Sequence, residues 1–205
     1  VGAGLPIIHT LNDLVRSGDR IDRIEAVLSG TLNFVFNNYD GTRQFADVVR
    51  QAQTEGYTEP DPRLDLSGTD VARKILILAR ESGFKIEMDE IENTGFLPES
   101  CLAGDVDDFY SELGRNEPHF RRLLDSARDQ GLKLKYIASF NDGRASVGLQ
   151  SIGPDHNFAT LSGKDNAVLF YTKRYSAQPL VIKGAGAGAD VTAAGVFADI
   201  IRAAR

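Results

Sequence analysis

The sequence contains few of the residues that cross-link small proteins through disulfides or metal ions. Its single cysteine, Cys101, cannot form a disulfide within the chain, and its three histidines are widely separated. These features argue against a disulfide-stabilised secreted fold and against a local zinc motif. We therefore expect a cytoplasmic protein without a structural zinc site.

Basic residues and long apolar runs are also scarce. The 23 lysines and arginines are scattered along the chain and are outnumbered by 29 aspartates and glutamates, which gives a net charge of −6. This balance argues against a nucleic-acid partner. The longest apolar runs, such as KILILA, are much shorter than a membrane span, and no basic-then-apolar leader opens the chain. The sequence thus predicts neither nucleic acid nor membrane as a partner.

The sequence lacks an initiator methionine, because it opens on VGAGLPII. We therefore expect a piece of a longer protein. The 205 residues are 42% hydrophobic and 25% charged, which is ordinary for a soluble domain with a sizeable core. We expect residues 1–205 to form one domain.

The hydrophobic pattern changes from a helical period to a strand period along the chain. Helical spacing predicts helices at 5–15, 32–39, 45–53, 71–79, 106–113, 118–130 and 191–205. Strand patterns occur at 20–29, 134–140, 145–152, 166–175 and 179–183. Thr31 is the expected N-cap of the second helix, and Asp142-Gly143 predicts a hairpin turn. Because helices come first and adjacent strands follow, we predict an α+β fold with a mixed, largely antiparallel sheet covered by helices on one face.

Two glycine-rich segments, VGAGLP and KGAGAGAD, raise the possibility of nucleotide binding. The second places Gly184, Gly186 and Ala189 in a G-x-G-x-x-A pattern between a strand and a helix. A dinucleotide fold also needs a further strand with an acid for the ribose about twenty residues later, and the sequence ends at Arg205. We therefore disfavour a pyrophosphate site here. A tight turn and the close approach of a flat group to the backbone remain open alternatives.

The stretch GYTEPDPRLDLSGTDVARK, residues 56–74, concentrates acids and two prolines just before an apolar helix that carries a lysine. Pro60 and Pro62 fix φ and restrain the preceding residues, Glu59 and Asp61. The loop should therefore be stiff, and its carboxylates should point in fixed directions. A loop that only keeps the protein hydrated gains nothing from that stiffness.

Two interpretations of Asp70 are open. Ser67 and Asp70 have the S-x-x-D spacing that caps a helix, and an acid in the first turn also favours the helix dipole. Alternatively, Asp70 positions Lys74, which lies four residues later on the same face. We expect the helix 71–79 to be buried because it is apolar nearly all round, so that Lys74 must be paired or reach out to water.

An exposed Asp–Lys pair at this spacing stabilises a helix by only ~0.2–0.5 kcal/mol, too little to explain a buried lysine. The pattern therefore favours a functional Lys74, positioned by Asp70 and facing an acid-lined cavity. Such a cavity suits a ligand with an ammonium group, and a lysine suits proton transfer to an oxygen.

The same stretch, taken with VGAGLPII, LSGTLNFVFN and GAGAGADVTAAGVFADIIRAA, resembles the catalytic, substrate-binding region of homoserine dehydrogenase. The segments GDVDDFYSEL and FYTKRYSAQPLVI, and the end of the chain directly after the last helix, are more similar to the bifunctional aspartate kinase–homoserine dehydrogenases. The resemblance implies NAD(P)-dependent interconversion of L-aspartate 4-semialdehyde and L-homoserine, in the pathway to threonine and methionine.

The resemblance also implies roles for the acids and the lysine. Lys74 would be the general acid that protonates the carbonyl oxygen as hydride arrives, and Asp70 would hold Lys74 and the substrate hydroxyl. Glu59 and Asp65 match carboxylates near the substrate amino group. The remaining pocket residues implied by the resemblance are Tyr57, Gly30 and Thr31.

Cofactor and ion sites are implied in the same way. Gly188 matches a glycine that approaches the nicotinamide of NADP or NAD. The backbone carbonyls of Val1, Ala3 and Leu5 match part of a monovalent cation site, for sodium or potassium, whose remaining ligand is expected upstream of Val1. The resemblance further implies a preceding Rossmann nucleotide-binding domain and a homodimer. The alternative is a non-catalytic amino-acid-binding or dimerisation module.

Overall fold

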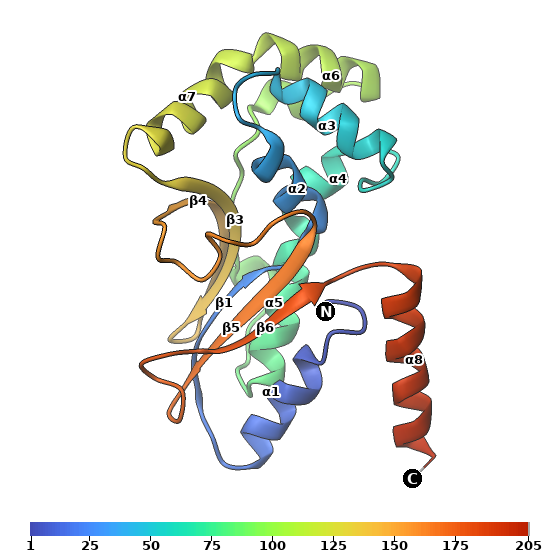
Figure 1. The fold of residues 1–205 in the computed structure, drawn as a ribbon, viewed down its shortest axis with the longest axis vertical. Helices are drawn as coiled ribbons and strands as arrows, with labels where there is room; N and C mark the ends of the chain where they lie inside the picture. Colours follow the sequence, from blue (N-terminus) through green and yellow to red (C-terminus); the bar gives the residue numbers. More distant parts are fainter. Residues whose placement is uncertain (205) are drawn as a thin grey trace.

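The computed structural model describes residues 1–204, which form an α+β fold around one six-stranded sheet with the order β2-β4-β3-β1-β5-β6 (Figure 1). The strands are β1 (Ile21–Val27), β2 (Glu92–Thr94), β3 (Lys133–Asn141), β4 (Arg144–Ile152), β5 (Asp165–Thr172) and β6 (Leu180–Ala185). β2 pairs with β4 in parallel, and the other neighbouring strands are antiparallel. The predicted mixed, largely antiparallel sheet is confirmed.

Eight α-helices and two short 3₁₀ helices lie within the described residues. The α-helices are α1 (Ile7–Arg16), α2 (Gly30–Asn38), α3 (Phe45–Thr54), α4 (Arg63–Leu66), α5 (Thr69–Glu81), α6 (Val106–Arg115), α7 (Glu117–Arg128) and α8 (Ala189–Ala203). The 3₁₀ helices are η1 (Met88–Glu90) and η2 (Glu99–Leu102). All predicted helices are present, although Arg205, predicted in the last one, lies outside the described residues. α4, β2 and the 3₁₀ helices were not predicted, because each is too short to show a hydrophobic period.

The two faces of the sheet are covered differently. Ile24 and Ala26 of β1 face the main core, where α5 packs on β3 and β4 with α1 beside it (Figure 1). Val27 points to the opposite face, because side chains alternate along a strand. There it joins a smaller cluster in which Phe158 and Leu161 of the segment 153–164 are fully or nearly fully buried. Helices therefore cover one face, as predicted, and an irregular segment covers part of the other.

The structure corrects one predicted helix cap and argues against a second cap that the sequence left open. The N-cap of α2 is Ser29, whose Oγ accepts a hydrogen bond from the Leu32 N–H at 3.1 Å, so the prediction of Thr31 was wrong. The helix begins one residue before Thr31, which leaves the threonine hydroxyl free for other partners. The Ser67–Asp70 capping box, one of the two interpretations of Asp70 that the sequence left open, is absent from the start of α5, where Gly68 is the N-cap with a left-handed φ of 72°.

The prediction that α5 is buried all round was also wrong. Its buried positions are Val71, Ala72, Ile75, Leu78 and Ala79. Ile77 is 44% exposed, because the sheet covers α5 on one side and this residue points away from it. The helix is therefore amphipathic, and Lys74 lies at the border between its two faces with its side chain 26% exposed.

α8 stands apart from the rest of the molecule, at the right of Figure 1. It has no buried residue, and Val196, Phe197 and Ile200 are each more than half exposed. It contacts α1, where His9 Nε2 lies 3.0 Å from Asp199 Oδ1 of α8. Among residues 1–204, no helix is long and apolar enough to cross a membrane.

Candidate active site

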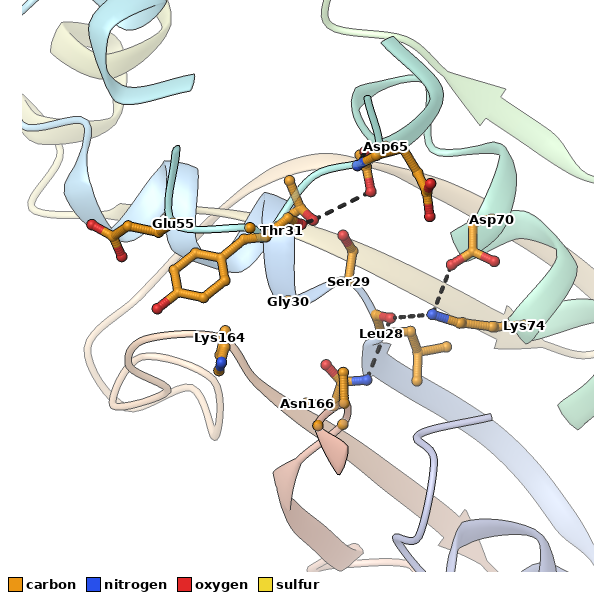
Figure 2. A pocket seen from close by; sticks show the side chains of 16 residues that line it. Leu28, Ser29, Gly30, Thr31, Glu55, Asp65, Asp70, Lys74, Lys164 and Asn166 are labelled. Carbon is orange, nitrogen blue, oxygen red and sulfur yellow. Dashed lines mark hydrogen bonds and ion pairs between the residues drawn. The ribbon is translucent and has the colours of Figure 1, made fainter. Parts of the chain in front are cut away.

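A cavity of about 440 Å³ opens where the end of β1 meets the start of α2, the acidic segment before α5 and the turn between β6 and α8 (Figure 2). Most of the residues implied by the sequence resemblance line it, although they come from four separate parts of the chain. These residues are Gly30, Thr31, Tyr57, Glu59, Asp65, Asp70, Lys74 and Gly188.

Lys74 is held by two oxygens at the wall of this cavity. Its Nζ lies 2.7 Å from Asp70 Oδ2, one helical turn earlier on α5, and donates a hydrogen bond to the Leu28 carbonyl at 2.9 Å (Figure 2). An ammonium group has three N–H donors, so one remains for a ligand. The arrangement presents a fixed proton donor to the cavity.

The Leu28 carbonyl, at the end of β1, also accepts a hydrogen bond from Asn166 Nδ2 at 3.4 Å. Asn166 belongs to β5 and is 2% exposed. A Cβ on Gly186 would lie 2.2 Å from the Asn166 side chain, so glycine is required there for the backbone to pass. One function of the glycine-rich run is therefore a close approach to Asn166.

Neither Asn166 nor the Leu28 carbonyl was predicted as part of the site. A backbone carbonyl cannot be recognised as a site group from the pattern of side chains. Asn166 could have been suspected, because it is a polar residue at the start of the apolar run AVLFY.

Asp65, on the one-turn helix α4, is held in the cavity wall by two hydrogen bonds. Its Oδ2 accepts a hydrogen bond from the Glu59 N–H at 2.8 Å, and its Oδ1 accepts from Thr31 Oγ1 at 3.3 Å. The Thr31 hydroxyl also lies within hydrogen-bonding reach of the Tyr57 carbonyl. Burial raises the pKa of the Asp65 carboxyl above its usual value, although the two hydrogen bonds oppose this shift. The side chain of Glu59 is exposed.

A second lysine, Lys164, lies across the cavity from Lys74 in Figure 2. Its Nζ lies 4.5 Å from the centroid of the Tyr57 ring, within range of a cation–π contact. Lys164 was not predicted as a site residue, because nothing in SGKDN distinguishes it from an ordinary surface lysine.

Gly188 sits at the N-terminus of α8 with φ 131°, and a Cβ there would meet no atom within 4 Å. The rim of the cavity is therefore open beside it. The strand before it, β6, is antiparallel to β5. A dinucleotide fingerprint instead lies in a βαβ unit of parallel strands, so the described part of the glycine-rich run has a different architecture.

The three residues of the expected cation site, Val1, Ala3 and Leu5, do not line this cavity. They lie in the N-terminal segment and line a separate space of about 450 Å³ against α8. Ala3 has φ 48°, which is unusual for a residue other than glycine. The Leu5 carbonyl already accepts a hydrogen bond from the Ile7 N–H at 2.7 Å. Over residues 1–204, no three His, Cys, Asp or Glu side chains are grouped to hold a metal ion.

Comparison with known proteins identifies the family. The family model for homoserine dehydrogenase matches residues 6–201, nearly the whole chain. The chain belongs to the homoserine dehydrogenase family. It is 49% identical to the chloroplastic bifunctional aspartokinase/homoserine dehydrogenase 2 of Zea mays, an alignment that covers 100% of this chain and 23% of the maize protein. It is 41% identical to a homoserine dehydrogenase of Emericella nidulans, covering 98% of this chain and 58% of that protein.

Solved structures agree with this assignment to the homoserine dehydrogenase family. A Candida auris protein described as of unknown function superimposes with a TM-score of 0.93 and 42% identity, over 98% of this chain and 58% of that one. A hyperthermophilic archaeal homoserine dehydrogenase, solved in complex with NADPH, superimposes with a TM-score of 0.72 and 28% identity, over 100% of this chain and 53% of that one. The chain thus spans only a part of each relative, about a quarter of the bifunctional maize enzyme.

Proposed function

We propose that this chain is the substrate-binding and catalytic part of an NAD(P)-dependent enzyme that interconverts L-aspartate 4-semialdehyde and L-homoserine. The observation that carries the proposal is the Lys74 ammonium, held between Asp70 and the Leu28 carbonyl and facing an acid-lined cavity. Membership of the homoserine dehydrogenase family supports the choice of reaction.

The acids of the cavity suit the amino group of this substrate. Asp65 is fixed by the Glu59 N–H and by Thr31, and the exposed Glu59 also lines the cavity. A substrate ammonium bound between these two carboxylates would offset the cost of an ionised, partly buried Asp65. Glu59 and Asp65 therefore bind and orient the amino acid, with Tyr57, Gly30 and Thr31 forming the neighbouring wall.

Reduction of the aldehyde adds a hydride to the carbonyl carbon and a proton to the carbonyl oxygen. A nicotinamide cofactor, when bound, supplies the hydride. Lys74 donates the proton and becomes neutral, and in the reverse direction neutral Lys74 takes the proton from the homoserine hydroxyl. The Asp70 carboxylate, 2.7 Å from Lys74 Nζ, keeps that amino group aimed at the oxygen.

The open rim at Gly188 suits the flat nicotinamide ring, since no Cβ blocks its approach. The residues that would hold the pyrophosphate and ribose are expected in a Rossmann domain of the full-length protein. The archaeal relative solved with NADPH supports NADP or NAD as the cofactor. Linkage to an aspartate kinase domain, as the names of the bifunctional relatives indicate, and assembly into a homodimer belong to the same proposal.

The proposal also includes a monovalent cation bound by the N-terminal segment. The carbonyls of Val1 and Ala3 would hold sodium or potassium, with Leu5 as a third ligand. Carbonyl oxygens are suitable donors for such hard ions. The left-handed backbone at Ala3 supports the idea of a turn shaped around a ligand.

The test uses the full-length natural protein that carries these residues. Reduction of NADP or NAD should depend on L-homoserine, and Lys74→Ala should lower kcat by ~100-fold with a smaller change in KM. Lys85→Ala is the control, because Lys85 is exposed and lies outside the cavity. Absence of homoserine oxidation in the wild type would instead favour the non-catalytic module, and an unchanged kcat in Lys74→Ala would make that lysine structural.

A further inference from the structure

The charges that line the cavity are unevenly paired. Four acids line it, among them Glu59 and Asp65, together with two lysines. Lys74 is already engaged by Asp70 at 2.7 Å. Over residues 1–204, no carboxylate forms an ion pair with Lys164. Lys164 thus brings the cavity an ammonium group that none of its acids pairs with directly.

The backbone around Lys164 is anchored, although its side chain is exposed. The Asn33 side-chain amide donates hydrogen bonds to the carbonyls of Gly163 and Asp165, at 3.1 and 3.2 Å, one on each side of the lysine. Lys135, 1% exposed, donates to the carbonyl of Leu161 at 2.7 Å. Buried polar side chains therefore hold the backbone of the loop that carries Lys164.

The loop also packs closely on the start of α2. A Cβ on Gly30 would lie 3.0 Å from the Lys164 carbonyl oxygen and 3.3 Å from its Cβ, so glycine lets the two segments approach. The ammonium of Lys164 then rests over the Tyr57 ring, 4.5 Å from the centroid. These contacts place the Lys164 ammonium group at the cavity wall, on the side opposite Lys74 (Figure 2).

An α-amino acid brings one ammonium and one carboxylate into this cavity. The carboxylate would be repelled by the acids unless a cation received it. We infer that Lys164 binds the α-carboxylate of the amino-acid substrate and thereby selects α-amino acids over simple amines. This inference rests on the proposed function, because it assigns the third polar group of the same substrate. Lys164 would contact the substrate directly. Lys135 and Asn33 act through it, by holding the backbone of the loop that carries it.

The experiment compares L-homoserine with 3-amino-1-propanol, which has the same hydroxyl and ammonium groups but no carboxylate. In the full-length protein, Lys164→Met should raise KM for L-homoserine by on the order of 10- to 100-fold, as expected for loss of a charged hydrogen bond. Its kcat should change less than KM, because Lys164 does not touch the reacting oxygen. The ratio of kcat/KM values for the two substrates should fall by a similar factor. Lys164→Arg should restore part of it.

Lys85→Met is the matched control, because it removes an exposed lysine outside the cavity and should leave the ratio unchanged. An unchanged ratio in Lys164→Met would overturn the inference. A rise in KM for the nicotinamide cofactor with an unchanged KM for L-homoserine would also overturn it, by assigning Lys164 to the cofactor. Both results differ from failure of the proposed function, in which the wild type would not oxidise L-homoserine at all.

Discussion

Lys74 Nζ lies 2.7 Å from Asp70 Oδ2, with the two residues one turn apart on α5. Asp70 stands in the first turn of this helix, but its carboxylate does not cap the helix, since Gly68 occupies the N-cap. Of the two interpretations that the sequence left open, the geometry favours the one in which Asp70 positions the lysine.

Asp70→Asn separates these interpretations by experiment. The exchange keeps the size of the side chain and removes the charge that holds Lys74. We expect kcat to fall by on the order of 10-fold or more, while the free energy of unfolding changes by less than about 0.5 kcal/mol, because the Asp70 side chain is 56% exposed. Asp107→Asn, an exposed first-turn acid of α6, is the control for the helix dipole. Normal turnover with reduced stability would revive the capping interpretation.

Asp65→Asn should weaken substrate binding more than it affects kcat. Burial raises the pKa of this carboxyl, so Asp65 becomes protonated at a higher pH than an ordinary aspartate. A neutral Asp65 cannot pair with the substrate ammonium, and KM for L-homoserine should therefore rise as pH is lowered into the acid range. The variant should show a high KM and lose this part of the pH dependence. A KM profile identical to that of the wild type would remove Asp65 from the binding site.

Lys135 is a buried lysine whose partners are all neutral. Its Nζ donates to Asn33 Oδ1 at 2.9 Å, to Asn37 Oδ1 at 2.6 Å and to the Leu161 carbonyl at 2.7 Å. Burial lowers its pKa to about 8. The unfolded chain, with a lysine pKa of about 10.4, therefore binds more protons than the folded one between these values, and stability from this group should rise with pH.

The corresponding measurement is the free energy of unfolding of the wild type minus that of Lys135→Met, followed with pH. The difference should increase by about 1–2 kcal/mol between roughly pH 8 and 9.5. The same comparison with Lys85→Met should be flat, because that lysine is exposed. A difference that stays constant or decreases over this range would show that Lys135 does not lose its proton there in the folded protein.

Gly68→Ala should destabilise the entry to α5. Gly68 has φ 72°, and a Cβ there would lie 1.9 Å from the hydroxyl of Tyr136, which is 2% exposed. Gly83 is a matched control, with φ 91° and no atom within 4 Å of an added Cβ. Gly83→Ala reports backbone strain alone, about 1–2 kcal/mol. Urea unfolding should show a larger loss for Gly68→Ala, and equal losses would mean that Tyr136 moves aside freely.

Local patterns predicted much of this molecule from the sequence. The helical period and the hairpin turn identified the main elements, and four-residue spacing placed Asp70 beside Lys74. Burial was less predictable: α5 appeared apolar all round, yet Ile77 faces outward because nothing in residues 1–204 covers that side. The capping residue of α2 was also misjudged, since one residue of shift in a helix start is not visible in the hydrophobic pattern.

The rest of the site depends on contacts between distant segments. Asn166 donates to the Leu28 carbonyl, 138 positions away in the chain. Asn33 donates to the Gly163 carbonyl beside Lys164, 130 positions away. A hydrophobic period contains no information on such pairings. Thr31, Glu59 and Asp65 were named through the resemblance to a family, and their hydrogen bonds became visible only in the fold.

The proposed mechanism requires Lys74 to face the reacting oxygen of an amino-acid substrate held by Glu59 and Asp65. A crystal structure of the full-length protein with L-homoserine tests it most directly. We expect the substrate hydroxyl at hydrogen-bond distance from Lys74 Nζ, about 2.7–3.2 Å, with the ammonium between the two carboxylates. Homoserine bound with its hydroxyl away from Lys74, or outside this cavity, would contradict it.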